Sequence, residues 1–459
     1  MSLQSRYRFP AAWLAEGWRR NVVISVDPSG DIVDVAADDV GSTARMVNGA
    51  AIPGMPNAHS HAFQRAMAGL AERRGSSQDS FWSWRETMYR IAACMTPELL
   101  NAVAAQLYAD MLKAGYTSVC EFHYLHHRPD GRPYENPAVM CEALIDAAGV
   151  AGIGLTLLPT LYQTSDFGGA APTERQRQFV MGAEDYLRVV ESARAAAQRI
   201  QAEVGLALHS LRAVPAAAMT EVLATAGDQS RVIHIHIAEQ EREVVAAQAH
   251  LGRRPIEWLL ENAAVDQRWC LVHATHVTNQ ELEGMAQRGA VVALCPTTEG
   301  NLGDGLFPTR RWLDLGGAFA IGSDSHVCLS PVEELRWLEY QARLEQRRRN
   351  VLASESEPST GALLWKGAAE AGAAVSGRRS GVLEAGARAD IVVLDVNAPL
   401  FAGRRDEAII DTFVFAGGPD AVRDVMVGGR WLVQDGKHYA ETAVSAGYRR
   451  AVAKILNAR

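Results

Sequence analysis

Residues 52–67 have the sequence IPGMPNAHSHAFQRAM. Within them, Gly54–His59 is a short apolar segment of the length of a buried strand, and the pair His59 and His61 stands at its end. Side chains two residues apart on an extended chain point to the same side. The two imidazoles can therefore reach one metal ion from one strand end.

Seven more short apolar segments follow, separated by helical stretches such as Pro97–Ala114, Arg175–Ala202 and Glu281–Arg288. We expect strands at Tyr116–Phe122, Gly152–Pro159, Val204–His209, Val232–Ile237, Trp269–His273, Ala290–Cys295 and Ala318–Ser323. Eight strands that alternate with helices are typical of a (β/α)8 TIM barrel. The sequence therefore predicts an α/β fold with such a barrel over residues 51–378.

The chain on both sides of the barrel favours short strands. Asn21–Val26 and Asp31–Ala36 are strand-like and are separated by a Pro-Ser-Gly turn. Near the other end, Ala389–Asp395 and Val422–Gln434 have the same character, and Gly428-Gly429 predicts a hairpin turn within the second of them.

Composition limits the class of protein. The 459 residues are 48% hydrophobic and 21% charged, with a net charge of −8. This balance is typical of a globular protein and argues against a broad nucleic-acid-binding face. No apolar run reaches the roughly 20 residues of a membrane span, and the N-terminus has no signal-peptide pattern. The six scattered cysteines favour neither disulfides nor a cysteine zinc site, so we expect a cytoplasmic protein without nucleic-acid or membrane partners.

Polar residues that can do chemistry stand where the predicted strands end. The fifth strand leads into His236 and Glu239, the sixth ends in His273, and Asp324 follows the eighth. Barrel enzymes keep their catalytic groups at this edge. Imidazoles with a carboxylate suit Zn²⁺, and Fe²⁺ is also possible. We expect one divalent ion per chain, because the fourth strand ends in His209 and not in the lysine that bridges two ions.

Taken together, Gly54–His61, His236, His273 and Gly322–Asp324 resemble the amidohydrolase superfamily, and the resemblance covers essentially the whole chain. Gly381–Asp395 and Val425–Arg430 are similar to the segments with which that family completes a second domain. The resemblance implies a metal-dependent barrel over residues 51–378, a composite β-sandwich domain from residues 1–50 and 379–440, and a C-terminal helix over residues 441–459. It also implies a homodimer.

Five segments are more specific and resemble the formimidoylglutamate deiminase family: Asn57–Met67, Asp79–Arg85, Glu121–His127, His209–Val214 and Ser323–Val327. This resemblance implies hydrolysis of N-formimidoyl-L-glutamate, a linear amidine of histidine degradation, to N-formyl-L-glutamate and ammonia.

Roles for the strand-end residues follow from the resemblance and from this chemistry. His59, His61, His236 and Asp324 are the expected metal ligands. A bound cation lowers the pKa of its water, and Glu239 would carry protons to the departing nitrogen. Asp324 could take the first proton. His273 would polarise the water, or act as a fifth ligand. Alternatively, Glu239 could only orient a metal ligand.

The expected substrate carries two carboxylates, which favour arginine partners. Arg212 follows the fourth strand, and Arg85 lies in the insertion after the first. In the family, both bind carboxylates together with Gln64, Tyr124 and His209. Alternatively, Arg212 could cap a helix, and Arg85 could merely stack on its aromatic neighbours Phe81, Trp82 and Trp84.

Two other functions stay open. The chain could deaminate an aminated heterocycle, such as guanine or an s-triazine, in a pocket of aromatic and amide groups. It could also be a non-catalytic scaffold barrel, although every expected ligand is present. We expect His123, His126 and His127 to support a loop, His234 to be a packed histidine, and Thr297–Gly305 to be a loop beside the substrate.

Overall fold

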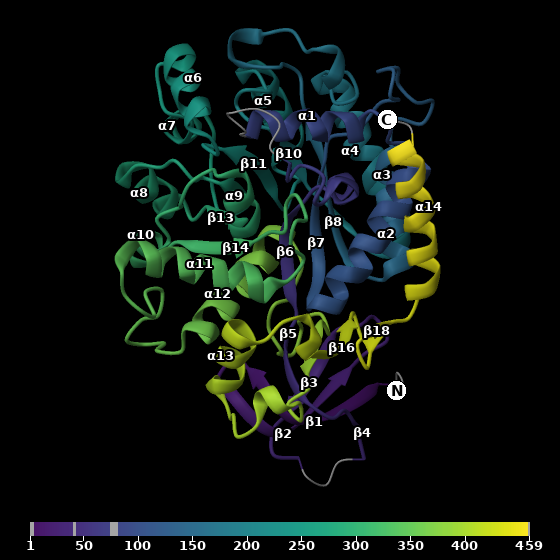
Figure 1. The fold of residues 1–459 in the computed structure, drawn as a ribbon, viewed down its shortest axis with the longest axis vertical. Helices are drawn as coiled ribbons and strands as arrows, with labels where there is room; N and C mark the ends of the chain where they lie inside the picture. The colour runs from purple at the N-terminus through teal and green to yellow at the C-terminus, as the bar shows by residue number, and fades with distance from the viewer. Residues whose placement is uncertain (1–3, 40–42, 74–80, 458–459) are drawn as a thin grey trace.

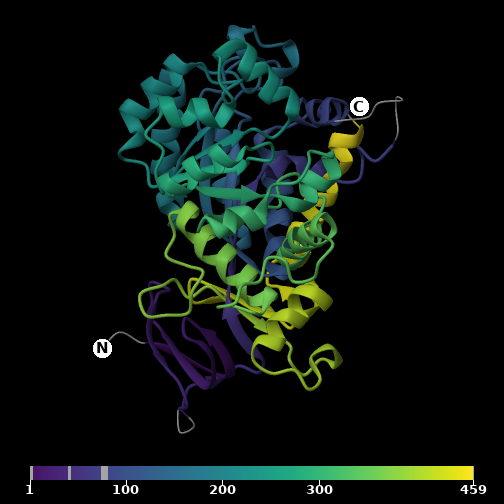
Figure 2. The ribbon, with the colours of Figure 1, turned by 90° about the vertical axis from the view of Figure 1, so that its left-hand side faces the viewer.

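The computed structural model describes residues 4–39, 43–73 and 81–457. A barrel surrounded by helices occupies one end of the molecule, and a smaller β-sheet occupies the other (Figure 1). Purple N-terminal strands and yellow-green C-terminal segments lie together in this smaller part, and Figure 2 shows the same arrangement after a quarter turn. Both ends of the chain therefore build the part opposite the barrel.

The barrel sheet is parallel throughout, with strand order β14-β13-β12-β11-β10-β8-β7-β6. Its strands are β6 (Met55–Ser60), β7 (Tyr116–His123), β8 (Gly154–Leu161), β10 (Leu206–Leu208), β11 (Ile233–Ile237), β12 (Trp269–His273), β13 (Val291–Leu294) and β14 (Ala318–Ile321), with β9 (Glu203–Val204) paired to β8. The eight predicted strands are confirmed, and Trp269–His273 is correct to the residue.

The barrel closes between its first and last strands. Ser60 and Asp324 form an isolated parallel bridge. The amide of Asp324 donates to the carbonyl of His59 (3.0 Å), and the amide of His61 donates to the carbonyl of Asp324 (3.2 Å). We call this junction of Ser60 and Asp324 the barrel seam. Two predicted metal ligands flank it and a third is part of it, so closure of the barrel brings them together.

The barrel helices are α1 (Phe81–Ala92), α2 (Pro97–Ala114), α3 (Val139–Ala151), α4 (Ala183–Ala197), α5 (Ala216–Val222), α6 (Glu241–Leu251), α7 (Pro255–Asn262), α8 (Asn279–Arg288), α9 (Pro296–Leu302), α10 (Thr309–Asp314), α11 (Pro331–Gln346) and α12 (Thr360–Ser376). The predicted boundaries of α2 are confirmed, because Thr96 caps its first turn and Gly115 ends it at φ 103°.

One predicted helix is too long. Arg175–Ala202 contains the shorter helix α4, which begins only after Gly182. The preceding chain is held in an irregular path, because the carbonyl of Gln178 accepts hydrogen bonds from the amides of His126 and His127. This contact between distant segments overrides the local helical pattern.

The second sheet has the strand order β18-β17-β16-β15-β5-β1-β2-β3, and β4 also pairs with β1. Its strands are β1 (Ser5–Leu14), β2 (Gly17–Val26), β3 (Ile32–Ala36), β4 (Arg45–Met46), β5 (Ala50–Pro53), β15 (Ile391–Leu394), β16 (Val422–Val427), β17 (Arg430–Gln434) and β18 (Lys437–His438). The rings of Tyr7 and Trp431 pack edge to face at 5.5 Å, so the sheet curls over a shared core as a sandwich does. The exact domain boundaries stay a prediction.

Two helices complete the chain, α13 (Glu407–Ala416) and α14 (Glu441–Asn457). α14 is the predicted C-terminal helix and packs against α2, where Ser445 donates a hydrogen bond to Gln106 (2.9 Å). Within the described ranges, no helix combines the length and the apolar character of a membrane span. Because β5 ends at Pro53 and β6 begins at Met55, the barrel strands start beside the second sheet and end away from it (Figure 1).

Candidate metal centre and catalytic pocket

Three histidines converge at the carboxyl ends of the barrel strands. His59 Nε2 lies 3.1 Å from His61 Nε2 and 3.0 Å from His236 Nε2. Asp324 Oδ1 lies 3.3 Å from His61 Nε2 and 3.5 Å from His59 Nε2. All four side chains are buried. The structure thus brings together the four residues predicted as metal ligands.

The hydrogen bonds around these rings fit a cation. His61 Nδ1 donates to the carbonyl of Phe122 (2.8 Å), and His236 Nδ1 donates to the carbonyl of His209 (3.0 Å). Both rings therefore direct an unprotonated Nε2 toward His59 Nε2. His59 Nε2 carries at most one proton, so it cannot donate a hydrogen bond to both of these nitrogens at once. Burial also lowers the pKa of all three histidines and keeps them neutral. A divalent cation at this point would satisfy the converging lone pairs, so the residues fit the predicted metal.

The backbone at the strand ends is unusual. Asp324, His273 and Ala238 all have positive φ, at 41°, 70° and 52°. Non-glycine residues rarely adopt this conformation, and it clusters where surrounding structure holds functional groups. Here it turns the chain sharply after β11, β12 and β14, next to Glu239, His273 and Asp324.

His273 lies in a ring of carboxylates. Its Nδ1 contacts Glu299 Oε1 at 3.2 Å, and its Nε2 lies 3.9 Å from both Glu239 Oε1 and Asp324 Oδ2. Burial alone would lower the pKa of His273, but Glu239, Glu299 and Asp324 outweigh it and raise this pKa to about 10. Burial raises the pKa of Glu239 to about 7. The surrounding carboxylates thus favour the cationic form of His273, and the pKa of Glu239 lies near neutral pH.

All the predicted site residues except His59 line one pocket above the histidines, and His59 lies beneath them. Arg85 comes from α1 and Arg212 from the loop after β10. Burial lowers the pKa of Arg85, and the charge of Arg212 adds to this effect. The pocket therefore combines the carboxylate-lined candidate metal centre with two neighbouring arginines. Residues 74–80, including Asp79 and Ser80 of the Asp79–Arg85 segment, lie outside the described residues.

The structure bears on the two alternative roles, aromatic stacking by Arg85 and helix capping by Arg212. Arg85 lies over the ring of Tyr89, which is not one of the three aromatic neighbours expected for it, at 5.4 Å from the ring centre, and it lines the pocket at the same time. Arg212 donates a hydrogen bond to the carbonyl of Ser165 (3.1 Å) and is not a helix cap, because α5 begins only at Ala216.

Gln64, Tyr124 and His209 form one wall of the pocket. The amide of Gln64 donates to the Tyr124 hydroxyl (3.0 Å), and the Gln64 carbonyl oxygen is buried without a hydrogen-bond partner among the described residues. His209 Nδ1 contacts the Ser210 hydroxyl at 3.0 Å. Burial lowers the pKa of His209, and Arg212 adds to this effect. The wall therefore offers polar groups to a bound molecule.

Several residues of the site were not predicted. Tyr89, Tyr162 and Phe179 add aromatic surface to the pocket, and Glu299 holds His273. The prediction of a loop over Thr297–Gly305 is wrong for residues 297–302, which belong to α9. The Glu299 carboxylate accepts a hydrogen bond from the amide of Cys295, and Pro296 occupies the first turn, so both stabilise the start of this helix. Proline at the start and Gly303 at the end were available signals.

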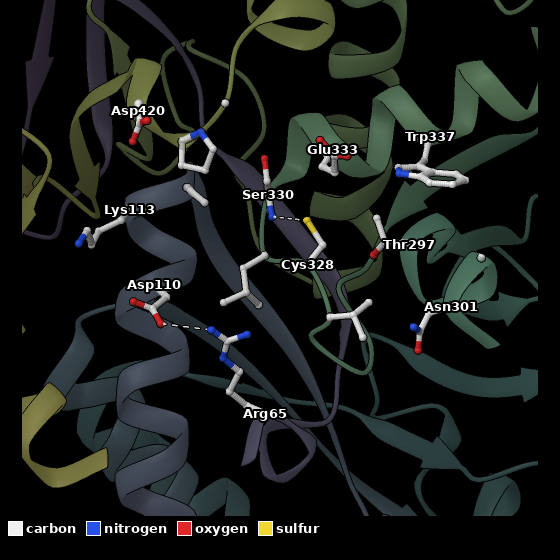
Figure 3. A pocket seen from close by; sticks show the side chains of 16 residues that line it. Arg65, Asp110, Lys113, Thr297, Asn301, Cys328, Ser330, Glu333, Trp337 and Asp420 are labelled. Carbon is white, nitrogen blue, oxygen red and sulfur yellow. Dashed lines mark hydrogen bonds and ion pairs between the residues drawn. The ribbon is translucent and has the colours of Figure 1, made fainter. Parts of the chain in front are cut away.

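A wider hollow, of about 860 Å³, lies outside the barrel between α2 and α11 (Figure 3). Arg65, Asp110 and Lys113 line one side of it, and Thr297 and Trp337 line the other. It shares no lining residue with the pocket above the histidines. Although this hollow is larger, it is separate from the pocket that contains the candidate catalytic residues.

Comparisons with known proteins agree with this geometry. The family model described as "Amidohydrolase family" matches residues 50–432. Formimidoylglutamate deiminase of Pseudomonas aeruginosa is 50% identical over 446 residues, which are 97% of this chain and 98% of that protein. The crystal structure of an amidohydrolase from Brucella melitensis has a TM-score of 0.94 and 44% identity, covering 98% of this chain and 100% of that one. An adenosine deaminase from Xanthomonas campestris with bound zinc shares the fold, with a TM-score of 0.82, 21% identity and 98% of each chain covered.

Proposed function

Because the chain belongs to the amidohydrolase family, we propose that it hydrolyses the C–N bond of N-formimidoyl-L-glutamate to give N-formyl-L-glutamate and ammonia. The observation that carries this proposal is the pairing of Arg85 and Arg212 above a centre of histidines and carboxylates. Such a pocket suits a substrate with two carboxylates at one end and a hydrolysable amidine at the other. The near full-length identity with a formimidoylglutamate deiminase supports the same reaction.

The metal centre of this proposal consists of His59, His61, His236 and Asp324, which would hold one divalent ion. When bound, the ion would lower the pKa of a water molecule toward neutrality and so supply hydroxide for attack on the amidine carbon. The native ion is proposed to be Zn²⁺, because imidazole with carboxylate suits it.

The protein's own groups handle the protons. Asp324 Oδ2 and Glu239 Oε1 both lie near His273 Nε2, so the three groups can share protons over a short distance. Glu239, with a pKa of about 7, can hold a proton and deliver it to the amidine nitrogen, which must leave as ammonia. The cationic His273 would stabilise negative charge that develops at the reacting carbon's oxygen. Glu299 fixes the orientation of its ring.

Other residues of the same pocket would position the substrate. Arg212 and Arg85 would bind the carboxylates, and Gln64, Tyr124 and His209 would complete the polar surface. The buried Gln64 carbonyl oxygen is available to accept a hydrogen bond from the substrate. This arrangement distinguishes the proposal from a heterocycle deaminase, which has no use for two pocket arginines, although the aromatic rings of Tyr89, Tyr162 and Phe179 would suit one.

Ammonia release by the purified, zinc-loaded protein tests the proposal, with N-formimidoyl-L-glutamate, guanine and cytosine supplied in parallel. Release from the first substrate alone is expected. Turnover of a heterocycle alone would keep the metal chemistry and refute the role of the arginines. Failure with all three, by folded protein that contains metal, would favour the scaffold alternative. A cytoplasmic location and a homodimer are also proposed, and sedimentation of the purified protein tests the second.

A further inference from the structure

A second group of metal-ligand side chains lies outside the catalytic pocket. His123 ends β7, His126 stands in the loop that follows, and Cys141 lies in the first turn of α3. One ligand atom from each of the three lies within 4.8 Å of the others. All three residues are almost completely buried, at 1–2% exposed.

This cluster is separated from the catalytic centre by the barrel wall. Phe122 packs inward, with its ring 4.4 Å from the ring of His236. Because successive side chains of a strand point to opposite faces, His123 points outward, toward the layer of helices. Cys141 belongs to that layer, so the cluster lies between β7 and α3.

Hydrogen bonds to the backbone decide which ring nitrogens carry protons. His126 Nε2 donates to the carbonyl of Thr160 (3.0 Å), which leaves Nδ1 as the unprotonated nitrogen. The ring of His123 makes a hydrogen bond with the backbone of Leu125, and its Nε2 is the ring nitrogen without a partner among the described residues. Neither His126 Nδ1 nor His123 Nε2 has a hydrogen-bond partner among the described residues.

Buried polar atoms are almost always paired, and metal-ligating histidines characteristically donate their other nitrogen to a carbonyl. We propose that His123, His126 and Cys141 bind one closed-shell cation of soft or borderline character, either Zn²⁺ or Cu⁺, at a structural site outside the active site. Thiolate with imidazole is the ligand set that such ions prefer. Binding replaces the thiol proton of Cys141, which is released to solvent.

The ion would join the end of β7 to α3. The loop between these elements carries Tyr124, which lines the catalytic pocket, so the site would stiffen one pocket wall. The sequence predicts one divalent ion per chain, from the lack of a bridging lysine after the fourth strand. The site proposed here would add a second ion, held by other residues.

Cobalt substitution tests the proposal, because only a thiolate ligand gives Co²⁺ an intense near-ultraviolet charge-transfer band. The catalytic centre contains no cysteine among its proposed ligands. Protein produced with cobalt in place of zinc is expected to show this band. The double variant His59→Ala/His61→Ala should keep the band, and Cys141→Ser, which changes little in volume, should lose it together with one equivalent of metal.

Absence of the band from cobalt-loaded wild-type protein would overturn the proposal. So would a band that persists in Cys141→Ser, since another thiol, such as Cys295 beside His273, would then be the ligand. If Cys141→Ser does not fold, X-ray absorption of the His59→Ala/His61→Ala protein decides the question: one sulfur neighbour is expected, and nitrogen and oxygen neighbours alone would refute the site. The same measurement identifies the ion, because zinc and copper absorb at different X-ray edges.

Discussion

Glu239 Oε1 lies 3.9 Å from His273 Nε2, although Glu239 follows β11 and His273 ends β12. Each residue shifts the pKa of the other. The carboxylate of Glu239 raises the pKa of His273, and the charge of His273 opposes the increase in the pKa of Glu239 that burial causes. The pair can therefore hold a proton near neutral pH at the place where an amidine nitrogen must receive one.

Glu239→Gln removes the proton carrier and keeps the shape of the side chain. We expect kcat to fall by about 10²–10⁴-fold, the usual contribution of a positioned acid or base, with metal content unchanged. Steady-state kinetics and metal analysis of the same preparation measure both quantities. Glu241→Gln, at an exposed position two residues away, is the matched control and should behave as wild type. Near-normal turnover of Glu239→Gln would refute the proton-transfer role.

Arg212→Ala removes one of the two pocket cations. Hydrogen bonds to charged groups contribute about 1.5–3 kcal/mol, so we expect KM for N-formimidoyl-L-glutamate to rise roughly 10- to 100-fold. The proposed metal ligands are untouched, so metal content should stay constant. Arg188→Ala, on the exposed face of α4, is the control for the loss of one positive charge. An unchanged KM would exclude Arg212 from substrate binding.

Gly322→Ala tests how tightly β14 packs on the metal centre. A Cβ at this position would lie 2.7 Å from His59 Cβ and 3.0 Å from Cys295 Sγ. Because His59 cannot move without disturbing the converging nitrogens, we expect weaker metal retention and a loss of stability of about 1–3 kcal/mol. Metal content after dialysis and the unfolding midpoint measure these effects. Gly447→Ala in α14 meets no neighbour within 4 Å and should keep the metal without lowering the unfolding midpoint, whereas equal losses in the two variants would contradict the argument.

Because His234 is buried, we expect the protein to lose stability in acid. Burial lowers its pKa from 6.5 to about 4, against the opposing hydrogen bond from Nε2 to the carbonyl of Val375. The unfolded chain binds this proton below pH 6.5 and the folded chain does not until about pH 4, so the free energy of unfolding falls as the pH drops through that window.

His234→Gln keeps a donor for Val375 and removes this titration. Between pH 6.5 and pH 4 the variant should lose less stability than wild type, by on the order of 3 kcal/mol. Denaturant unfolding at several pH values measures the difference. Identical pH dependence of the two proteins would show that His234 does not titrate in this way.

The helices and strands that could be predicted well from the sequence are those whose ends are set by neighbouring residues in the chain. β12 and α2 were placed to the residue, because an apolar run ends at His273 and because Thr96 and Gly115 mark the limits of the helix. The candidate ligands could be found for the same reason: each stands at or near the end of a short apolar segment, and the barrel topology brings such positions together.

What the sequence did not reveal depends on contacts between distant segments. Tyr89, Tyr162 and Phe179 meet only after the barrel has formed, and no local pattern marks them as neighbours. β5 was missed because it is four residues long and owes its existence to pairing with β1 and β15, from opposite ends of the chain. The two unpaired nitrogens of His123 and His126 also depend on carbonyls that only the fold supplies.

The barrel seam has a consequence for synthesis of the protein. His59 and His61 leave the ribosome early, but Asp324, which closes the barrel beside them, emerges only after most of the chain has been made. A growing chain therefore cannot bring the four residues together before Asp324 emerges, and a product that stops before Ser323 lacks both the closing bridge and one of the four proposed ligands. Truncated chains of this kind are therefore expected to lack the hydrolytic activity proposed for the whole protein, because the residue that closes the barrel is also a proposed metal ligand.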